Sequence, residues 1–178
     1  DSGYDSVMQE IVKRGHSIGI HSVSHDYSEI YASPEAYFSD LHRMQDIIYE
    51  NTGVRTTLVR FPGGSSNTIS RFNRGIMTML TEAVQNAGFQ YFDWNVSSGD
   101  GGNDSTSESV ITRITSQIQD HDESVVLCHD TKENKHRQRT LLQNFETGII
   151  TNAGEEPHHP ARCGALSQHE GQEVSGQV

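Results

Sequence analysis

The chain has 178 residues, enough for one domain or a part of one, and a formal net charge of -11. That charge excludes the basic surface by which proteins bind nucleic acid and argues against contact with an anionic membrane. Hydrophobic residues make up only 33% of the sequence, so we expect unpacked segments or an incomplete core. The sequence holds no apolar run long enough to span a membrane.

Apolar residues recur at helical spacing in four segments, and each segment is followed by a short stretch typical of a strand. The expected helices span about residues 4–14, 34–51, 74–87 and 108–118, and the expected strands span 16–20, 56–60, 89–96 and 124–128. Two helix starts are marked, by Ser33 as N-cap before Pro34 and by Ser107 as the cap of the last helix. This alternation predicts an α/β fold with parallel strands, in a sheet or a barrel.

Each predicted strand is followed by a loop whose composition suits a binding or catalytic site. These loops are residues 21–25 (HSVSH), 60–67 (RFPGGSSN), 94–100 (WNVSSGD) and 129–131 (HDT). Because parallel strands place their C-terminal ends at one edge, we expect the four loops to meet on a single rim.

The HSVSH loop is the candidate metal site. His21 and His25 are four residues apart, a spacing that puts both rings on one side of a turn, and neutral imidazole binds Zn and related metals. Two histidines make at most half of a tetrahedral site, and a carboxylate is the usual third ligand. Asp26, Asp100 and Asp130 are candidates without a diagnostic spacing. Taken alone, the pair is more typical of surface or packing histidines.

Four further features of the rim each have a functional and a structural interpretation. Arg60 ends a strand and would either orient a carboxylate or form a strand-end salt bridge. Gly63 and Gly64 would offer backbone N–H groups to an oxyanion, or simply form a turn. His129 is a candidate general acid or a structural histidine. Trp94 would wall a sugar site or belong to the core.

Two side chains with nucleophilic atoms receive no catalytic role from the sequence. Ser65 lacks the five-residue G-x-S-x-G elbow of serine hydrolases. Cys128 lies in an apolar run, so we expect it to be a small buried hydrophobe.

Residues 135–178 differ in character from residues 1–134. They hold two of the four prolines and four of the ten histidines, and from about residue 151 they show no periodicity. We expect one short helix and strand near 141–150, followed by a disordered or non-native tail.

Taken together, HSVSH, RFPGG, DWNVSSGD and VVLCHDT resemble successive motifs of the polysaccharide deacetylase family, also known as NodB-homology domains or family 4 carbohydrate esterases. The variant is similar to the peptidoglycan and chitooligosaccharide deacetylases of Firmicutes, and the resemblance covers about residues 1–134. It implies a distorted (β/α)7 barrel, a divalent metal that is most often Zn or otherwise Co, a polysaccharide substrate carrying N-acetylglucosamine, and an extracellular or cell-surface location.

The resemblance also implies a role for individual residues. His21 and His25 would be metal ligands, Arg60 would orient the catalytic base, Gly63 would bind the oxyanion, Leu127 would line the acetyl pocket, and His129 would protonate the departing amine. We expect Trp94 and Asp100 to lie at the substrate as well.

Two departures from the family pattern stand out. The first motif, a T-F-D-D-G-like strand end that should supply the base and the third metal ligand, is absent. The resemblance places it upstream of residue 1, so we expect a partial barrel without its N-terminal strand or strands, inactive or nearly so. The carboxylate that tunes the acid histidine aligns best with Ser97, although Asp100 could substitute. A frameshifted C-terminus would explain the unusual tail.

Two other interpretations stay open at this stage. A non-catalytic glycan-binding or structural member of the same fold would have lost the missing aspartates altogether. An unrelated parallel α/β metal-binding domain would place His129 far from His21 and His25.

Overall fold

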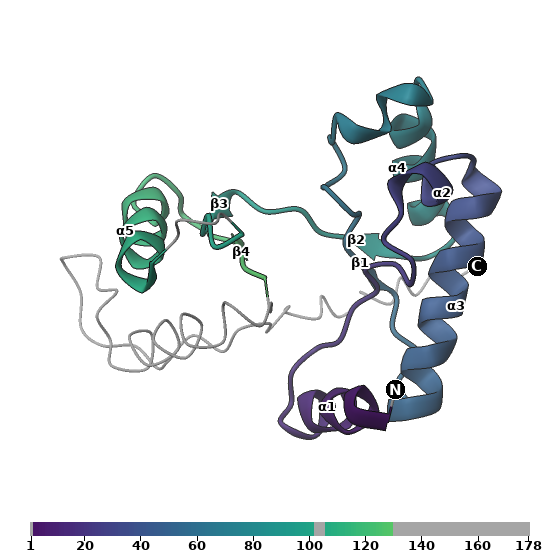
Figure 1. Ribbon diagram of the computed structural model, residues 1–178, viewed down its shortest axis with the longest axis horizontal. Helices are drawn as coiled ribbons and strands as arrows, with labels where there is room; N and C mark the ends of the chain where they lie inside the picture. The colour runs from purple at the N-terminus through teal and green to yellow at the C-terminus, as the bar shows by residue number, and fades with distance from the viewer. Residues whose placement is uncertain (1, 102–105, 130–178) are drawn as a thin grey trace, which may run out of the picture.

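The computed structural model describes residues 2–101 and 106–129 (Figure 1). Asp130 and the whole of the predicted tail, with its expected helix and strand near 141–150, lie outside these residues. The described elements are α1 (Ser2–Lys13), α2 (Tyr27–Ile30), α3 (Pro34–Thr52), β1 (Leu58–Val59), η1 (Ile69–Phe72), α4 (Ile76–Asn86), β2 (Gln90–Tyr91), β3 (Val96–Ser97), α5 (Ser107–Ile118) and β4 (Val126–Leu127). Helices and short strands alternate along the chain, which confirms the α/β class.

The strands pair in parallel, as predicted, but in two separate sheets. β1 pairs with β2 and β3 pairs with β4. The expected strand at 16–20 is reduced to an isolated bridge between Ile20 and Val59. The expected strand at 89–96 divides into β2 and β3, and the side chain of Asn95 bonds to the backbone of Glu123 and Val125 beside the break. The partial barrel is not visible in these two pairs and stays a prediction.

Local capping signals explain where the longer helices begin and end. The Ser33 hydroxyl accepts from the Ala36 N–H at the start of α3, and Gly53 ends the helix in the left-handed region with φ of 73°. The N-cap of α5 is Thr106, one residue before the expected Ser107, because Thr106 and Ser109 form a reciprocal capping box. The short α2 and η1 were not predicted.

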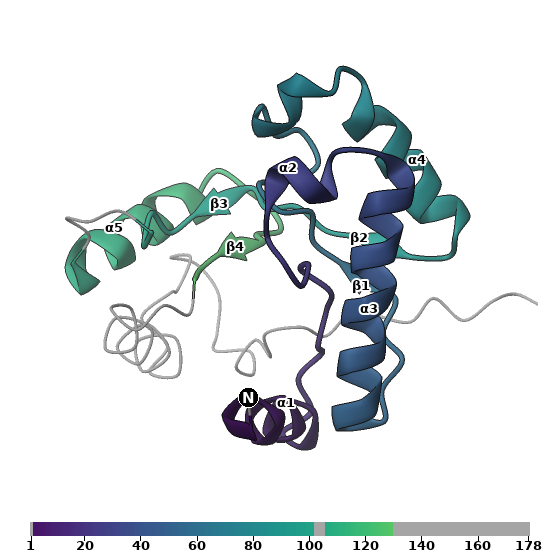
Figure 2. The same cartoon turned by 45° about the vertical axis from the view of Figure 1, so that its right-hand side comes forward.

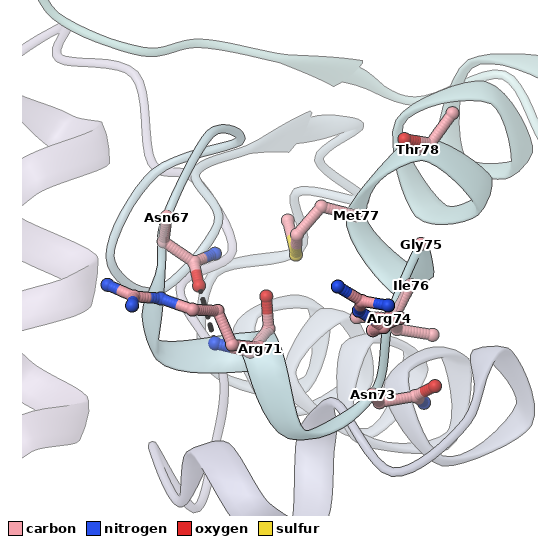
Figure 3. A pocket seen from close by; sticks show the side chains of 9 residues that line it. Asn67, Arg71, Asn73, Arg74, Gly75, Ile76, Met77 and Thr78 are labelled. Atoms are coloured by element: carbon pink, nitrogen blue, oxygen red, sulfur yellow. Dashed lines mark hydrogen bonds between the residues drawn. The ribbon is translucent and has the colours of Figure 1, made fainter.

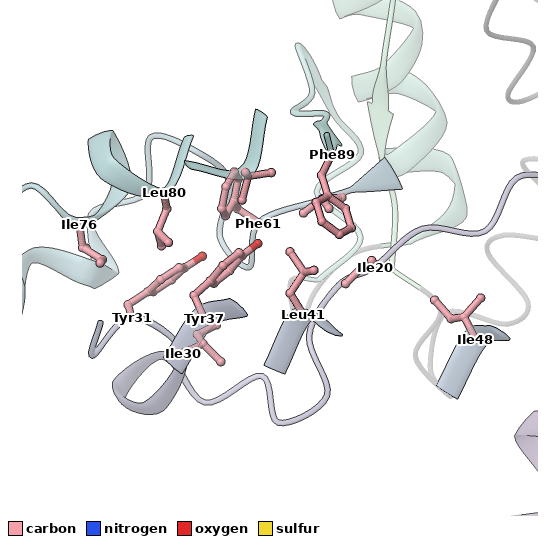
Figure 4. Close-up of a cluster of buried hydrophobic side chains, with 12 residues drawn as sticks. Ile20, Ile30, Tyr31, Tyr37, Leu41, Ile48, Phe61, Ile76, Leu80 and Phe89 are labelled. Carbon is pink, nitrogen blue, oxygen red and sulfur yellow. The ribbon is translucent and has the colours of Figure 1, made fainter. Parts of the chain in front are cut away.

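Buried apolar side chains form a large cluster and a small one. Figures 1 and 2 show the helices and strands that carry them. The large cluster belongs to residues 2–94, here called the main lobe, and Figure 4 shows it packed between α2, α3, β1 and α4. The small cluster comprises Val96, Val110 and Ile114 and belongs to residues 95–101 and 106–129, here called the minor lobe. The main lobe is therefore the principal scaffold of the described fold.

The minor lobe leaves apolar surface uncovered. Val125 is 44% exposed, and Val126 and Leu127 are only half-buried. Cys128 is exposed, so the prediction of a buried hydrophobe was wrong: β4 has only β3 as a strand neighbour among the described residues. None of the helices within residues 2–101 and 106–129 has the length and apolar character needed to cross a bilayer.

Candidate active site

The HSVSH loop brings its two imidazoles together by an irregular turn. Ser22 and His25 have φ of 75° and 51°, in the left-handed region that non-glycine residues seldom adopt. The Ser22 hydroxyl accepts a hydrogen bond from the His25 backbone N–H at 3.0 Å. The ring centroids of His21 and His25 lie 5.3 Å apart. The predicted pair therefore exists as a pair in space.

His21 has the protonation state that a metal ligand needs. Its Nδ1 lies 2.9 Å from the carbonyl oxygen of Arg60, and because a carbonyl can only accept, Nδ1 must carry the proton. Desolvation lowers the pKa of His21, although part of the side chain is exposed, and the charges of His25, Arg60 and His129 lower it further. At neutral pH the ring is therefore neutral, and Nε2 is the nitrogen available to a metal ion.

His129 follows β4 and is held by Asp100, which follows β3. The Asp100 carboxylate accepts hydrogen bonds from the His129 backbone N–H at 2.6 Å and from its Nδ1 at 2.8 Å. Burial alone would raise the pKa of Asp100, but these bonds and one from Ser98 outweigh it, so the pKa is lowered and the carboxylate is ionised. The His129 side chain is 50% exposed while that of Asp100 is 2% exposed. An oriented imidazole is thus presented at the surface.

This pairing selects Asp100 from the two positions, Ser97 and Asp100, that the sequence left open. Ser97 does not contact His129; it is exposed, and its backbone bonds to the side chain of Gln117. Asp100 bonds to His129 in place of Ser97, and Gly99 just before it has φ of 66°. Both oxygens of Asp100 are engaged, so its expected contact with the substrate stays a prediction.

One electrostatic effect links the two pairs of side chains. The charge of His129 lowers the pKa of His21, which requires the two rings to lie within electrostatic reach of each other. An unrelated domain, in which we expected His129 to lie far from the HSVSH loop, is therefore disfavoured. The meeting of all four loops on one rim stays a prediction.

Arg60 lies between the HSVSH loop and Trp94. The backbone N–H of Arg60 donates to the Ile20 carbonyl at 2.9 Å, which fixes its position beside the HSVSH loop. Its guanidinium lies 5.8 Å from the Trp94 ring centroid, and its Nε donates to the Phe92 carbonyl at 3.4 Å. Among the described residues no carboxylate forms an ion pair with Arg60, so the strand-end salt bridge is not found there.

The glycine turn after Arg60 is tightly fixed. Gly63 and Gly64 have φ of 77° and 87°, and a Cβ on Gly64 would lie 3.1 Å from the Trp94 ring. The Gly64 N–H donates to the Phe61 carbonyl. The Gly63 N–H has no hydrogen bond to any described residue, so it suits an oxyanion better than the Gly64 N–H does.

Asp93 fastens this turn from the neighbouring strand end. Its carboxylate accepts from the Ser65 backbone N–H at 2.9 Å and from the Ser65 hydroxyl. The Ser65 hydroxyl is thus engaged by a carboxylate and not by a histidine, which agrees with the lack of a serine-hydrolase elbow.

The remaining predicted residues occupy structural positions. Leu127 is half-buried in β4, and its carbonyl accepts from the Ser98 N–H. Asp26 caps α2 by accepting from Ser28, so this candidate metal ligand is already used. Within residues 2–101 and 106–129, no group of three metal-binding side chains assembles. The described residues fit the histidine part of a metal site and leave its carboxylate part unfilled.

A shallow hollow of about 570 Å³ lies away from these side chains, between η1 and α4. Figure 3 shows Asn67 and Arg71 at one side of it and Arg74 at the other. None of the residues predicted for the site lines this hollow, so it does not mark the candidate active site.

Sequence reasoning missed Asp40 and Asp93, which fix the two loops that carry the site. Asp40 lies on α3 and hydrogen-bonds to the backbone of the HSVSH loop. One signal was present: Asp40 is one turn from buried Tyr37 and next to buried Leu41, close to the apolar face of the helix. An acidic residue beside a buried stripe needs a hydrogen-bond partner.

Comparison with known proteins finds deacetylases by sequence and by structure. A catalytic domain of peptidoglycan N-acetylglucosamine deacetylase from Eubacterium rectale shares 41% identity with a TM-score of 0.76, over 89% of this chain and 76% of that one. A putative polysaccharide deacetylase, YheN, of Bacillus subtilis is 25% identical over 71% of this chain. The peptidoglycan-N-acetylglucosamine deacetylase of Bacillus cereus is 30% identical over 51% of it.

The alignments cover 44% of YheN and 32% of the Bacillus cereus protein, so the chain spans less than half the length of these curated relatives. The family model described as polysaccharide deacetylase matches residues 2–90, which is half of the chain. The match includes the HSVSH loop and the glycine turn, whose geometry is described above. The chain belongs to the polysaccharide deacetylase family.

Proposed function

We propose that this chain is part of a metal-dependent deacetylase that hydrolyses N-acetyl groups of a polysaccharide containing N-acetylglucosamine, such as peptidoglycan or a chitin-like polymer. One observation carries the proposal: His129, which Asp100 holds, lies within electrostatic reach of His21, which pairs with His25. Family membership and the names of the Eubacterium rectale and Bacillus cereus relatives support the substrate class. Action on a cell-wall polymer would place the protein at the cell surface.

His21 and His25 would hold the divalent metal, with Zn²⁺ as the first candidate and Co²⁺ as an alternative. The fit rests on the ring separation and on the Arg60 carbonyl, which fixes the proton on Nδ1 of His21. When bound, such an ion would supply a Lewis acid for the amide carbonyl and a water molecule with a pKa near ~7.

The chain's own residues would handle the proton and the developing charge. Hydrolysis joins the oxygen of water to the acetyl carbon and breaks the C–N bond, so the departing nitrogen must gain a proton. His129 would donate this proton from Nε2, while Asp100 holds Nδ1 and fixes the ring. The Gly63 N–H would donate to the oxyanion, and Leu127 and Trp94 would border the acetyl group and the sugar.

The catalytic base is the missing component among the described residues. Arg60 has a guanidinium on the rim without a carboxylate partner in residues 2–101 and 106–129. We expect the base and the third metal ligand to be the two aspartates of the T-F-D-D-G-like motif that the family resemblance implies. On this proposal, the 178-residue chain alone hydrolyses N-acetyl groups slowly or not at all.

The test is an acetate-release assay on N-acetylglucosamine oligomers with Zn²⁺ present. Two proteins are compared: the chain alone, and a chimera with a T-F-D-D-G-bearing strand of a family member fused ahead of Asp1. We expect acetate from the chimera and little from the chain alone. His129→Ala in the chimera should lower the rate by about 100-fold or more, because general acid catalysis contributes on that scale.

Three outcomes would contradict parts of this proposal. A folded, Zn²⁺-loaded chimera that releases no acetate contradicts the activity. If that chimera still binds the oligomers, the chain is a non-catalytic glycan-binding member of the family. If the chain alone releases acetate as fast as the chimera does, the claim that the chain lacks the catalytic base is wrong.

A further inference from the structure

We propose that Asp40 is a positioning residue that holds His21 and His25 at the separation needed to share one metal ion. This inference rests on the metal role proposed above. The Asp40 carboxylate accepts from the Val23 backbone N–H at 2.9 Å through Oδ2 and 3.2 Å through Oδ1, and from the Ser24 N–H at 3.1 Å. It therefore holds Val23 and Ser24, in the middle of the HSVSH loop, by hydrogen bonds to their backbone.

The loop needs an external support because its backbone is unfavourable. Ser22 and His25 both have positive φ, and neither is a glycine. The loop's own bonds, from His25 N–H to Ser22 Oγ and from Asp26 N–H to Ser24 Oγ, join near neighbours in its second half. These two bonds do not tie the loop to the rest of the fold. The bond from His21 Nδ1 to the Arg60 carbonyl ties only the first residue of the loop, so Val23 and Ser24 need a support of their own.

Asp40 supplies that tie from a rigid element. It lies on α3, which is capped at Ser33 and buries Tyr37 and Leu41 on either side of Asp40 along the chain. Two successive N–H groups that point the same way form a concavity that binds an anion, and an ionised carboxylate matches it with two acceptor oxygens. His21 precedes Val23 and Ser24 along the chain, and His25 follows them. Fixing Val23 and Ser24 therefore limits how far the two histidine rings can separate.

Both the charge and the shape of the Asp40 carboxylate suit the two N–H groups of the loop. Asparagine keeps the length of the side chain but turns one acceptor into a donor, which would face a backbone N–H. Alanine removes both acceptors. We therefore expect Asp40→Ala to loosen the loop more than Asp40→Asn, and both to leave α3 folded.

The test measures Zn²⁺ binding to the full chain by calorimetry and hydrogen exchange of the Val23 and Ser24 amides without metal. We expect Asp40→Ala to weaken Zn²⁺ binding about tenfold or more, as groups behind metal ligands typically do, and Asp40→Asn to weaken it less. Exchange at Val23 and Ser24 should quicken while the amides of α3 keep their protection. Asp46→Asn is the matched control, because Asp46 lies on the same helix in an exposed ion pair with Arg55.

Each outcome decides the inference. Zn²⁺ affinity of Asp40→Ala within twofold of the unmodified chain overturns it and leaves the proposed function standing. Loss of α3 protection in both Asp40 variants also overturns it, because the role would then be general folding. Absence of Zn²⁺ binding to the unmodified chain overturns the metal site and this inference together. Asp40-dependent binding combined with an inactive chimera upholds the inference and overturns the deacetylase activity.

Discussion

The two lobes differ in how firmly each can hold its share of the site. The main lobe buries twelve apolar side chains in one cluster, whereas the described part of the minor lobe buries three apolar side chains. The histidine pair, Arg60 and the glycine turn stand on the main lobe, and Asp100 and His129 stand on the minor lobe. A core of three residues gives little hydrophobic stabilisation, so the minor lobe should open locally far more often. The proposed metal ligands are thus better supported than the proposed acid.

The largest effect is expected from the main lobe. Phe61→Ala removes a fully buried ring that packs against Tyr37 and Tyr91, and should lower the free energy of unfolding by about 3–5 kcal/mol. Urea unfolding followed by circular dichroism measures this. Phe72→Ala is the matched control, because Phe72 is 58% exposed and its loss should cost less than about 0.5 kcal/mol. Equal effects of the two variants would show that the described core does not carry the fold.

A comparable deletion in the minor lobe should act locally. Ile114→Ala removes one of three buried side chains and should cost about 2–4 kcal/mol, spent on opening residues 95–129. Hydrogen exchange is expected to show faster exchange across α5 and unchanged exchange across α3. If both helices lose protection equally, the two lobes unfold as one unit and the contrast between them is wrong.

Asp100→Asn tests the join between β3 and β4. The variant replaces an ionised acceptor of three hydrogen bonds, from His129 twice and from Ser98, and should destabilise the minor lobe by about 2 kcal/mol. Ring ¹⁵N shifts of His129 should change, because Nδ1 loses its carboxylate hydrogen-bond partner. Ser97→Ala, which alters the residue that the alignment favoured, should leave these shifts unchanged; a shift would contradict the assignment of Asp100.

The same carboxylate predicts how the minor lobe responds to acid. Because the folded-state pKa of Asp100 lies below the ordinary value of 3.8, ionised Asp100 stabilises the fold above that value. The stabilisation is lost as the pH falls through 3.8 toward the lower folded-state pKa. Hydrogen exchange of α5 should therefore quicken in this range, and Asp100→Asn should remove that part of the pH dependence. An unchanged pH profile in the variant would contradict the lowered pKa.

The smallest effect is expected at the glycine turn. Ser65→Ala removes one hydroxyl bond to Asp93 and keeps the backbone bond, so it should cost about 0.5–1.5 kcal/mol. Thermal unfolding measures the loss, and Ser66→Ala, at the exposed neighbouring position, is the control. Indistinguishable melting temperatures for the two variants would argue against the Asp93 contact.

The sequence predicted best those features that depend on neighbouring residues. The start of α3 is marked by Ser33 and Pro34 and its end by Gly53, and all three act within a turn of their own position. The break between β2 and β3 escaped prediction because it depends on Asn95 bonding to a segment about 30 residues away. Sheet pairing of this kind is non-local, and a short apolar run does not reveal it.

The candidate site follows the same rule. His21 and His25 were visible as a pair because one short loop carries both. The sequence left Ser97 and Asp100 as alternatives because the register of a loop is not visible in its composition; the structure selects Asp100. Asp40 was missed because it meets the HSVSH loop from a helix 16 or 17 residues further along the chain.

The central claim is that both lobes contribute to one site, and paramagnetic NMR tests it directly. Cu²⁺, which suits imidazole ligands, is added to the labelled chain, and the ring signals of His129 are followed. We expect these signals to broaden as the HSVSH loop binds the ion, and to stay sharp when His21 and His25 are both replaced by alanine. Sharp His129 signals in the unmodified chain, with the His21–His25 pair saturated, would contradict it.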